Sequence, residues 1–127
     1  MKLRIKGSSL RLRLTQGEIR ELGEGRPVEE QVPFAAQATL TYRLKRDPEI
    51  PDITAFYTGN IIEIRVPDRA ALQWCGSEQV TLARSQPVPG GELRIALEKD
   101  FACLAPRADE DESDNFPHPA HGTSKVC

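Results

Sequence analysis

The sequence predicts an α+β fold in which a ββαββ unit occurs twice and forms an eight-stranded antiparallel barrel or half-barrel with two short helices. The first observation is an alternating apolar stretch that continues directly into a helical pattern, at residues 10–22 and again at residues 62–74, a shift of 52. The second is that residues 39–47 resemble residues 92–100 at a shift of 53. Two copies are too few for a solenoid, so they are expected to share one core.

These shifts define the expected domain organisation. A single domain spans residues 1–104 and contains two pseudo-repeats, residues 3–47 and 54–100. Residues 105–127 form an acidic tail that contains prolines and is expected to pack on the domain. An alternative is that any two amphipathic strand and helix units resemble one another at this level.

The first repeat opens with a predicted hairpin. Residues 2–6 alternate basic and apolar side chains, residues 7–9 read Gly-Ser-Ser, and residues 10–14 alternate again. Alternation with period two is typical of strands, and a tight turn between two strands makes them antiparallel. Thr15 and Glu18 have the spacing of a capping box, so a helix is expected to begin there.

The first repeat ends with two further strands. Gly23 or Gly25 can end the helix in the left-handed conformation. Residues 28–34 and 39–47 then alternate in the manner of strands, and Glu30 is the one charged residue on the otherwise apolar side of the first of them.

A linker with two prolines, residues 46–52, precedes the second repeat. Residues 53–57 and 61–66 form the next predicted hairpin, with a Thr-Gly-Asn turn between them. Pro67 suits the first turn of a helix, which continues through an apolar side to Trp74. Apolar residues at alternate positions between residues 80 and 97 complete the eight strands.

Charge is unevenly distributed along the chain. The net charge is −2, but residues 1–99 hold 15 basic and 13 acidic groups, whereas residues 100–127 hold 2 basic and 6 acidic groups. This balance argues against nucleic-acid binding, which favours a strongly basic domain. No apolar run approaches the 18 or so residues of a membrane span, and three cysteines form no disulfide framework. A cytoplasmic location and no membrane contact are expected.

A ladder of basic residues is the most informative constellation. Strand alternation places these residues off the apolar face, with Glu63 and Glu98 among them: Lys2, Arg4, Lys6, Arg11, Arg13, Arg43, Lys45, Arg65 and Arg94. The anion-binding candidates are Arg4, Lys6, Arg11, Arg13, Arg43, Arg65 and Arg94. Inside a closed barrel they would form a charged tunnel for phosphate or carboxylate oxygens. The alternative is a solvated outer face of an antiparallel sheet.

The tail offers two further hypotheses. Residues 109–114 hold five acidic groups, which could fold back over the arginines, with Phe101 and Phe116 as anchors; a solubilising tail is the alternative. A zinc site would need four ligands, and His118 and His121 lie at no standard spacing from Cys103 and Cys127.

No metal and no cofactor are therefore expected. Cys75 follows Trp74 near the end of a helix and is interpreted as a small buried residue rather than a nucleophile.

The two ends of the chain resemble a known group of sequences. MKLRIKGSSLRLRLTQGEI at the start, and EKDFACLAPR followed by EDESDNFPHP at the end, resemble a family of small bacterial proteins with no assigned function. The resemblance implies that residues such as Asp100, Phe101 and Arg107 belong to the domain. The duplicated architecture is also similar to the triphosphate-tunnel (CYTH-like) barrels. Their first strand reads Glu-x-Glu-x-Lys, of which only Lys6 is present here.

Three functions follow from these residues. The favoured one is a non-enzymatic module whose basic strand face binds a phosphate-containing or carboxylate small molecule or an acidic protein. The second is a divergent tunnel-type phosphohydrolase, which requires Glu30, Glu63 and Glu98 to converge. The third is a structural module that dimerises through a sheet edge. The sequence leaves the oligomeric state open.

Overall fold

A computed structural model describes residues 1–101 and 114–117 of the chain. The order of elements is ββαββ, repeated once. The elements are β1 (Lys2–Ile5), β2 (Ser9–Leu14), α1 (Gln16–Gly23), β3 (Val28–Ala35), β4 (Ala38–Asp47), β5 (Thr54–Thr58), β6 (Ile61–Pro67), α2 (Asp68–Cys75), β7 (Thr81–Val88) and β8 (Gly91–Lys99). The predicted α+β class, with eight strands and two helices, is confirmed.

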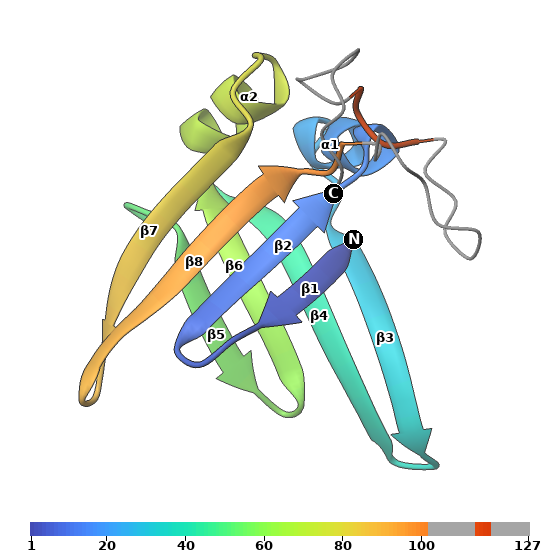
Figure 1. Cartoon of the computed structure of the whole chain (residues 1–127), viewed down its shortest axis with the longest axis vertical. Helices are drawn as coiled ribbons and strands as arrows, with labels where there is room; N and C mark the ends of the chain where they lie inside the picture. The colour runs from blue at the N-terminus through green and yellow to red at the C-terminus, as the bar shows by residue number, and fades with distance from the viewer. Residues whose placement is uncertain (102–113, 118–127) are drawn as a thin grey trace, which may run out of the picture.

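The strands form two four-stranded sheets that face each other (Figure 1). Sheet A has the strand order β1-β2-β8-β7, and sheet B has the order β3-β4-β6-β5. Each sheet therefore combines one hairpin from the first ββαββ unit with one from the second. The central pairs, β2 with β8 and β4 with β6, are parallel, whereas the outer pairs are antiparallel.

This arrangement differs from the expected antiparallel barrel in two ways. The described strands divide into two separate sheets and do not close into a barrel. The sheets are also mixed, because α1 carries the chain from β2 in sheet A to β3 in sheet B. The free edge of β2 then pairs with β8, which runs in the same direction. Parallel neighbours cannot be joined by a tight hairpin, and β2 and β8 are instead separated by most of the chain.

Strand register repeats with the same shifts as the sequence. Ser9 lies opposite Arg94 in sheet A, and Ile61 lies opposite Thr41 in sheet B. The residues on β2 and β6 differ by 52 positions, 61 minus 9, and those on β8 and β4 differ by 53, 94 minus 41. Equivalent residues of the two units thus occupy equivalent places, one in each sheet.

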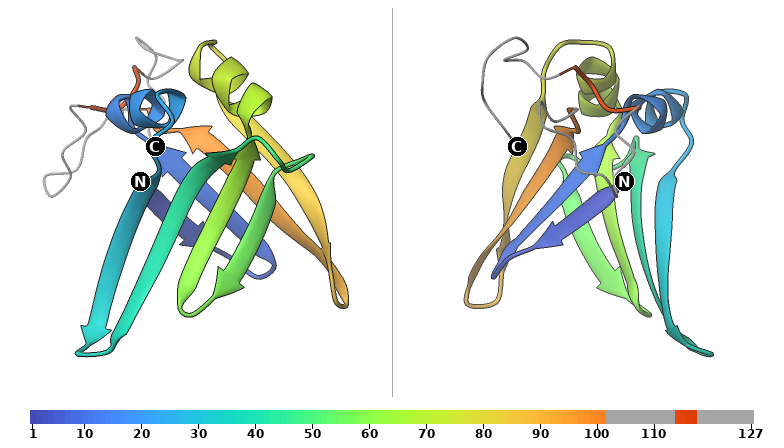
Figure 2. Two further views of the ribbon diagram at one scale, coloured as in Figure 1. Left: turned by 180° about the vertical axis from the view of Figure 1, so that it is seen from behind. Right: turned by 45° about the vertical axis from the view of Figure 1, so that its right-hand side comes forward.

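The core lies between the sheets and beneath the two helices, which cover the end where the sheets approach each other (Figure 2). Trp74 and Leu22 bring α2 and α1 into it and are completely buried. The fully buried strand residues come from alternate positions of the four central strands: Leu12, Leu14, Leu44, Ile64, Val66, Ile95 and Leu97. The apolar alternation seen in the sequence therefore marks the inner face of each sheet.

Helix α1 begins at the predicted capping box. The Thr15 hydroxyl accepts from the Glu18 amide at 3.4 Å, and the Thr15 amide donates to the Glu18 carboxylate at 3.0 Å. Of the two glycines predicted to end this helix, Gly25 adopts the left-handed conformation, with φ of 89°.

No helix within residues 1–101 and 114–117 has the length and apolar character that a membrane span requires.

Candidate functional site: the basic face of sheet A

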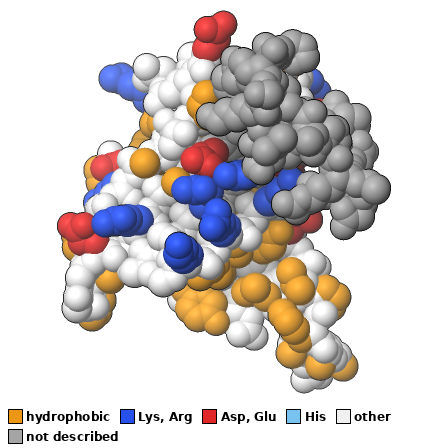
Figure 3. All heavy atoms as spheres, in the orientation of Figure 1, with side chains coloured by type: hydrophobic (Ala, Val, Ile, Leu, Met, Phe, Trp, Pro, Cys, Tyr) orange, Lys and Arg blue, Asp and Glu red, His pale blue; other side chains and the backbone are white. Residues whose placement is uncertain are grey.

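The predicted ladder of basic residues is divided between the two sheets and lies on the outer face of each. Leu10, Leu12 and Leu14 point inward from β2, so Arg11 and Arg13 point outward, and the other strands alternate in the same way. Lysine and arginine side chains gather on the outer face of sheet A, which faces the viewer in Figure 3. The charged ladder is therefore exposed to solvent on two sheets, and the described strands enclose no charged tunnel.

The outer face of sheet B is internally neutralised. Glu63 accepts from Arg43 at 2.7 Å and from Arg65 at 2.6 Å. Arg43 also donates to Glu29 at 2.6 Å, and Arg65 donates to Asp47 at 3.2 Å. Burial alone would raise the pKa of Glu63, but its hydrogen bonds with the two arginines bring the pKa below the ordinary value. These arginines have strong partners within the chain, so they are poorly suited to an external anion.

The outer face of sheet A carries more cations than anions. Strand register places Arg4 beside Arg11, and Arg13 between Lys2 and Glu98. Glu98 is the acid at the centre of this group, 3.5 Å from Arg11 and 3.3 Å from Arg13.

Three of the candidate cations on this sheet form no ion pair with another residue of the described chain. Among the described residues, Arg4, Lys6 and Arg94 form no salt bridge. We call the outward-facing group the basic face: Lys2, Arg4, Lys6, Arg11, Arg13 and Arg94.

Comparison of equivalent positions explains why the two outer faces differ. Glu63 of sheet B is replaced by Arg11 of sheet A, 52 residues earlier, and Arg43 is replaced by Ala96, 53 residues later. Sheet A therefore has an arginine where sheet B has its central acid, and a methyl group where sheet B has a guanidinium.

A depression of about 500 Å³ lies over this small side chain. Its outward-facing floor consists of Ser9, Ala83, Ser85 and Ala96. Arg11 and Arg94 line its sides. A second hollow of about 660 Å³ adjoins it and is lined by Lys6, the Gly7-Ser8-Ser9 turn, Glu92 and Arg94. Arg94 belongs to both, so it is the cation best placed to contact a bound anion.

The structure thus separates the seven anion-binding candidates into two groups. Five of them lie on the basic face: Arg4, Lys6, Arg11, Arg13 and Arg94. Arg43 and Arg65 lie apart on sheet B. The small floor residues were not predicted from the sequence. The alignment of the two repeats does, however, place Ala96 at the position equivalent to Arg43.

The three acids required by the phosphohydrolase hypothesis do not converge. Glu63 is on the outer face of sheet B, and Glu98 is on the outer face of sheet A. Glu30 points to the inner side of β3 and contacts the Met1 ammonium at 3.2 Å. Within the described part of the chain, no group of three or more histidine, cysteine or acidic side chains is arranged to hold a metal ion.

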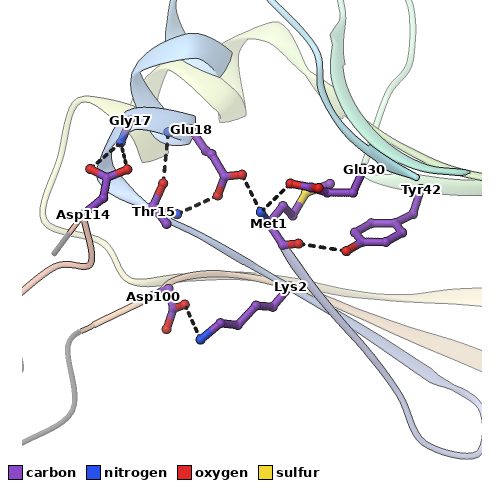
Figure 4. Close-up of polar contacts among 9 residues, drawn as sticks. All are labelled: Met1, Lys2, Thr15, Gly17, Glu18, Glu30, Tyr42, Asp100 and Asp114. Atoms are coloured by element: carbon purple, nitrogen blue, oxygen red, sulfur yellow. Dashed lines mark hydrogen bonds and ion pairs between the residues drawn. The ribbon is translucent and has the colours of Figure 1, made fainter. Parts of the chain in front are cut away.

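The N-terminus is held by carboxylates at the end of the molecule where the helices lie (Figure 4). The Met1 ammonium contacts Glu18 and Glu30, and the Met1 carbonyl accepts from the Tyr42 hydroxyl at 3.0 Å. Lys2 lies 3.2 Å from Asp100. The start of β1 is thereby joined to α1, sheet B and the end of β8.

Residues 114–117 pack at the same junction. Asp114 accepts from the Gly17 amide at the start of α1, at 3.2 Å from each oxygen, and the Phe116 amide donates to the Asp100 carbonyl at 2.7 Å. The rings of Phe101 and Phe116 have centroids 5.5 Å apart. Residues near the two ends of the described chain therefore lie side by side, through contacts at the start of α1 and just after β8.

Cys75 lies at the end of α2 and is partly buried. Burial raises the pKa of its thiol, and the nearby Lys99 and Arg46 only partly oppose this shift. The thiol form is favoured, which does not suit a nucleophile.

Several predicted residues fall outside the part of the chain that the structure describes. They are the acids 109–112, Cys103, Arg107, His118, His121 and Cys127.

The fold and the site define a class of protein: a small α+β protein with two mixed four-stranded sheets, of which one carries an exposed basic face. Residues 1–120 match a family of unknown function, DUF7009, and the chain belongs to that family. Searches among curated proteins and among solved structures find no match.

Proposed function

We propose that the protein is a non-enzymatic binding module whose basic face takes up a small oligoanion, with phosphate or carboxylate groups bound between Arg11 and Arg94. The observation that carries this proposal is the depression over Ala96, which is flanked by these two arginines. Guanidinium groups donate hydrogen bonds in a planar fork that matches phosphate and carboxylate oxygens.

The local charge supports an anionic ligand. Glu98 contacts Arg11 at 3.5 Å, a loose ion pair, whereas Glu63 is 2.7 and 2.6 Å from its two arginines on sheet B. An incoming anion can therefore bind Arg11 without breaking a tight ion pair to Glu98, and at Arg94 it meets no ion pair from residues 1–101 or 114–117.

The size and openness of the site favour binding over catalysis. A depression on the outside of a sheet leaves the ligand in contact with water, where charge interactions are weak and depend on salt. Several cations acting together on an oligoanion, such as pyrophosphate or triphosphate, would offset this weakness. The ligand is thus expected to carry at least two anionic groups.

The test is thermal unfolding of the full chain with pyrophosphate, triphosphate and citrate, at low and at physiological salt. A ligand that binds only the folded protein stabilises it by about 2.7 kcal/mol at a hundred times its Kd. We expect a rise in Tm that is larger at low salt, and at least about a tenfold weaker Kd in Arg94→Ala, the loss of about 1.4 kcal/mol of binding free energy.

Matched variants locate the site. Arg69 is exposed on α2 and lines neither hollow of sheet A, so Arg69→Ala removes one positive charge without touching the basic face. Ala96→Glu places a carboxylate between the two arginines and is expected to abolish binding. Binding of none of the three anions, or equal weakening by Arg69→Ala and Arg94→Ala, would refute the proposal.

A further inference from the structure

Four large apolar side chains at the end of the molecule away from the helices remain exposed. Ile5 is 57% exposed, Val32 37%, Phe34 73% and Tyr57 69%. Strand register places Val32 opposite Leu40 and Tyr57 opposite Ile62, on the inner faces of their sheets. These side chains therefore belong to the face that elsewhere forms the core. They carry no charge, and here nothing in the described chain covers them.

The uncovered surface lies mainly on one hairpin. In every view of Figures 1 and 2 the β3–β4 hairpin extends farther from the helices than the strands of sheet A. Its neighbour across the gap between the sheets is β1, which has only four residues. Figure 3 shows the resulting apolar surface below the basic face, because the inner side of sheet B faces the viewer there.

The equivalent side of the molecule is closed as far as Ala55 of β5, and Tyr57 lies beyond these contacts. Arg84 and Gln86 on β7 correspond to Val32 and Phe34 on β3 at the shift of 52. Arg84 donates to the Ile53 carbonyl at 2.6 Å, while Gln86 accepts from the Ala55 amide at 2.7 Å and donates to its carbonyl at 3.1 Å. Polar side chains of sheet A thus bind the backbone of β5, the edge strand of sheet B.

The open side has apolar residues where the closed side has these polar ones. On this open side, the polar contacts between the sheets that the described residues make are those of Met1 with Glu30 and Tyr42, near the helices. Because the two repeats are otherwise matched in register, this difference marks a surface suited to apolar contact from outside the chain.

The exposed edge of β3 is poorly suited to the addition of a strand. Pro33 lacks an amide hydrogen, and the register shifts between Pro33 and Ala35. Both features prevent a continuous ladder along an edge strand. A contact here would use the apolar side chains of the inner face rather than the strand edge.

We propose that this surface binds a second copy of the chain, with the β3–β4 hairpins of the two copies packed reciprocally about a two-fold axis. Val32 and Phe34 of each copy would then cover the area beside Ile5 and Tyr57 of the other. Each chain contains both a projecting apolar hairpin and an uncovered apolar area. In a two-fold contact the hairpin of each copy can cover the apolar area of the other, so both areas are buried at once. The basic faces stay outside the contact.

Charge and area both fit a copy of the same chain. An uncharged surface does not repel its own copy, whereas two basic faces would. Fully buried Phe or Tyr side chains remove about 150–250 Å² each from water. The four exposed side chains therefore offer roughly 400 Å² per copy, about half of the 800 Å² or so that each side of a standard interface buries. An apolar centre of this size, surrounded by a polar rim, is typical of such interfaces.

Sedimentation velocity of the full chain over a concentration series tests this proposal. We expect a species of twice the 14.1 kDa chain mass at the upper concentrations, and only the monomer for Phe34→Asp. The matched control is Leu72→Asp, because Leu72 is 50% exposed on α2 at the opposite end, and this variant should still dimerise. Far-UV circular dichroism and Trp74 fluorescence establish that each variant is folded, and Phe34→Ser replaces Phe34→Asp if the latter unfolds.

Three outcomes would overturn the proposal: a monomer at every concentration, a dimer that persists in the folded Phe34 variants, or a dimer that Leu72→Asp disrupts equally. A monomer that binds phosphatidylcholine vesicles through Phe34 would also reject the second copy and assign the surface to lipid. Binding of pyrophosphate is measured separately, so the failure of one proposal leaves the other standing.

Discussion

Glu63 shows how one carboxylate can neutralise a sheet face. Its side chain is nearly buried and accepts hydrogen bonds from both Arg43 and Arg65. Hydrogen bonds to Glu63 and to Glu29 raise the pKa of Arg43, so Arg43 and Glu63 are both held in their charged forms. On sheet A the equivalent position is Arg11, and no acid is central to the depression over Ala96. Two replacements, Glu63 by Arg11 and Arg43 by Ala96, thus separate a structural ion-pair cluster from a candidate anion site.

Glu63→Gln should lower the free energy of unfolding at pH 7, because hydrogen bonds between charged groups are lost. The two arginines are partly exposed, which limits the expected loss to about 1–2 kcal/mol. The folded-state pKa of Glu63 lies below its unfolded value. Its contribution is therefore fully present above the unfolded pKa and is lost as the pH falls through the folded pKa. Urea unfolding from pH 7 to pH 3 should show the difference between the two proteins shrinking. A difference independent of pH would contradict this assignment.

Helix α1 connects three parts of the chain through its first turn. The capping box of Thr15 and Glu18 satisfies two amides, and Glu18 also contacts the Met1 ammonium. Asp114 accepts from the Gly17 amide in the same turn, where a negative charge is favoured by the helix dipole. The start of this helix is consequently the place at which both ends of the described chain are held.

Thr15→Ala should destabilise the protein by about 1 kcal/mol, the usual loss for an N-cap side chain. Thr15→Ser retains the hydroxyl and is the matched control, with little expected change. Urea unfolding of the two variants measures both effects. Equal destabilisation by alanine and serine would show that the methyl group, rather than the hydrogen bond, is responsible.

The whole molecule depends on contacts between its two ββαββ units. Each sheet contains a hairpin from both units, joined by the parallel pairs β2 with β8 and β4 with β6. Neither unit has a sheet or a core of its own. The duplicated sequence therefore does not correspond to two independently stable halves.

Equilibrium unfolding should accordingly be a single cooperative transition. Trp74 is the only tryptophan, lies in α2 and is fully buried, so its fluorescence reports on the core from the second unit. Far-UV circular dichroism reports on the strands and helices of both units. The two urea transitions should coincide, and separate midpoints would indicate that one unit unfolds before the other.

Much of the local structure could be predicted from the sequence because it depends on near neighbours. Alternation with period two identified the strands and their inner residues, such as Leu12 and Ile64, and Thr15 with Glu18 identified the start of α1. Glu30 was recognised as a break in the apolar side of its strand, but its contact with the Met1 ammonium depends on residues 29 positions apart.

Alternation along the chain is enough to predict that each unit has one apolar and one polar strand face, and that the two units are alike. The separation of the sheets, the pairing of β2 with β8 and the exposure of the arginines to solvent are visible only in the folded protein. The physical reason is that alternation specifies which side chains share a face, whereas strand pairing and sheet closure depend on contacts between residues far apart in the chain. The depression over Ala96 forms only because β2, β7 and β8 are brought together in one sheet.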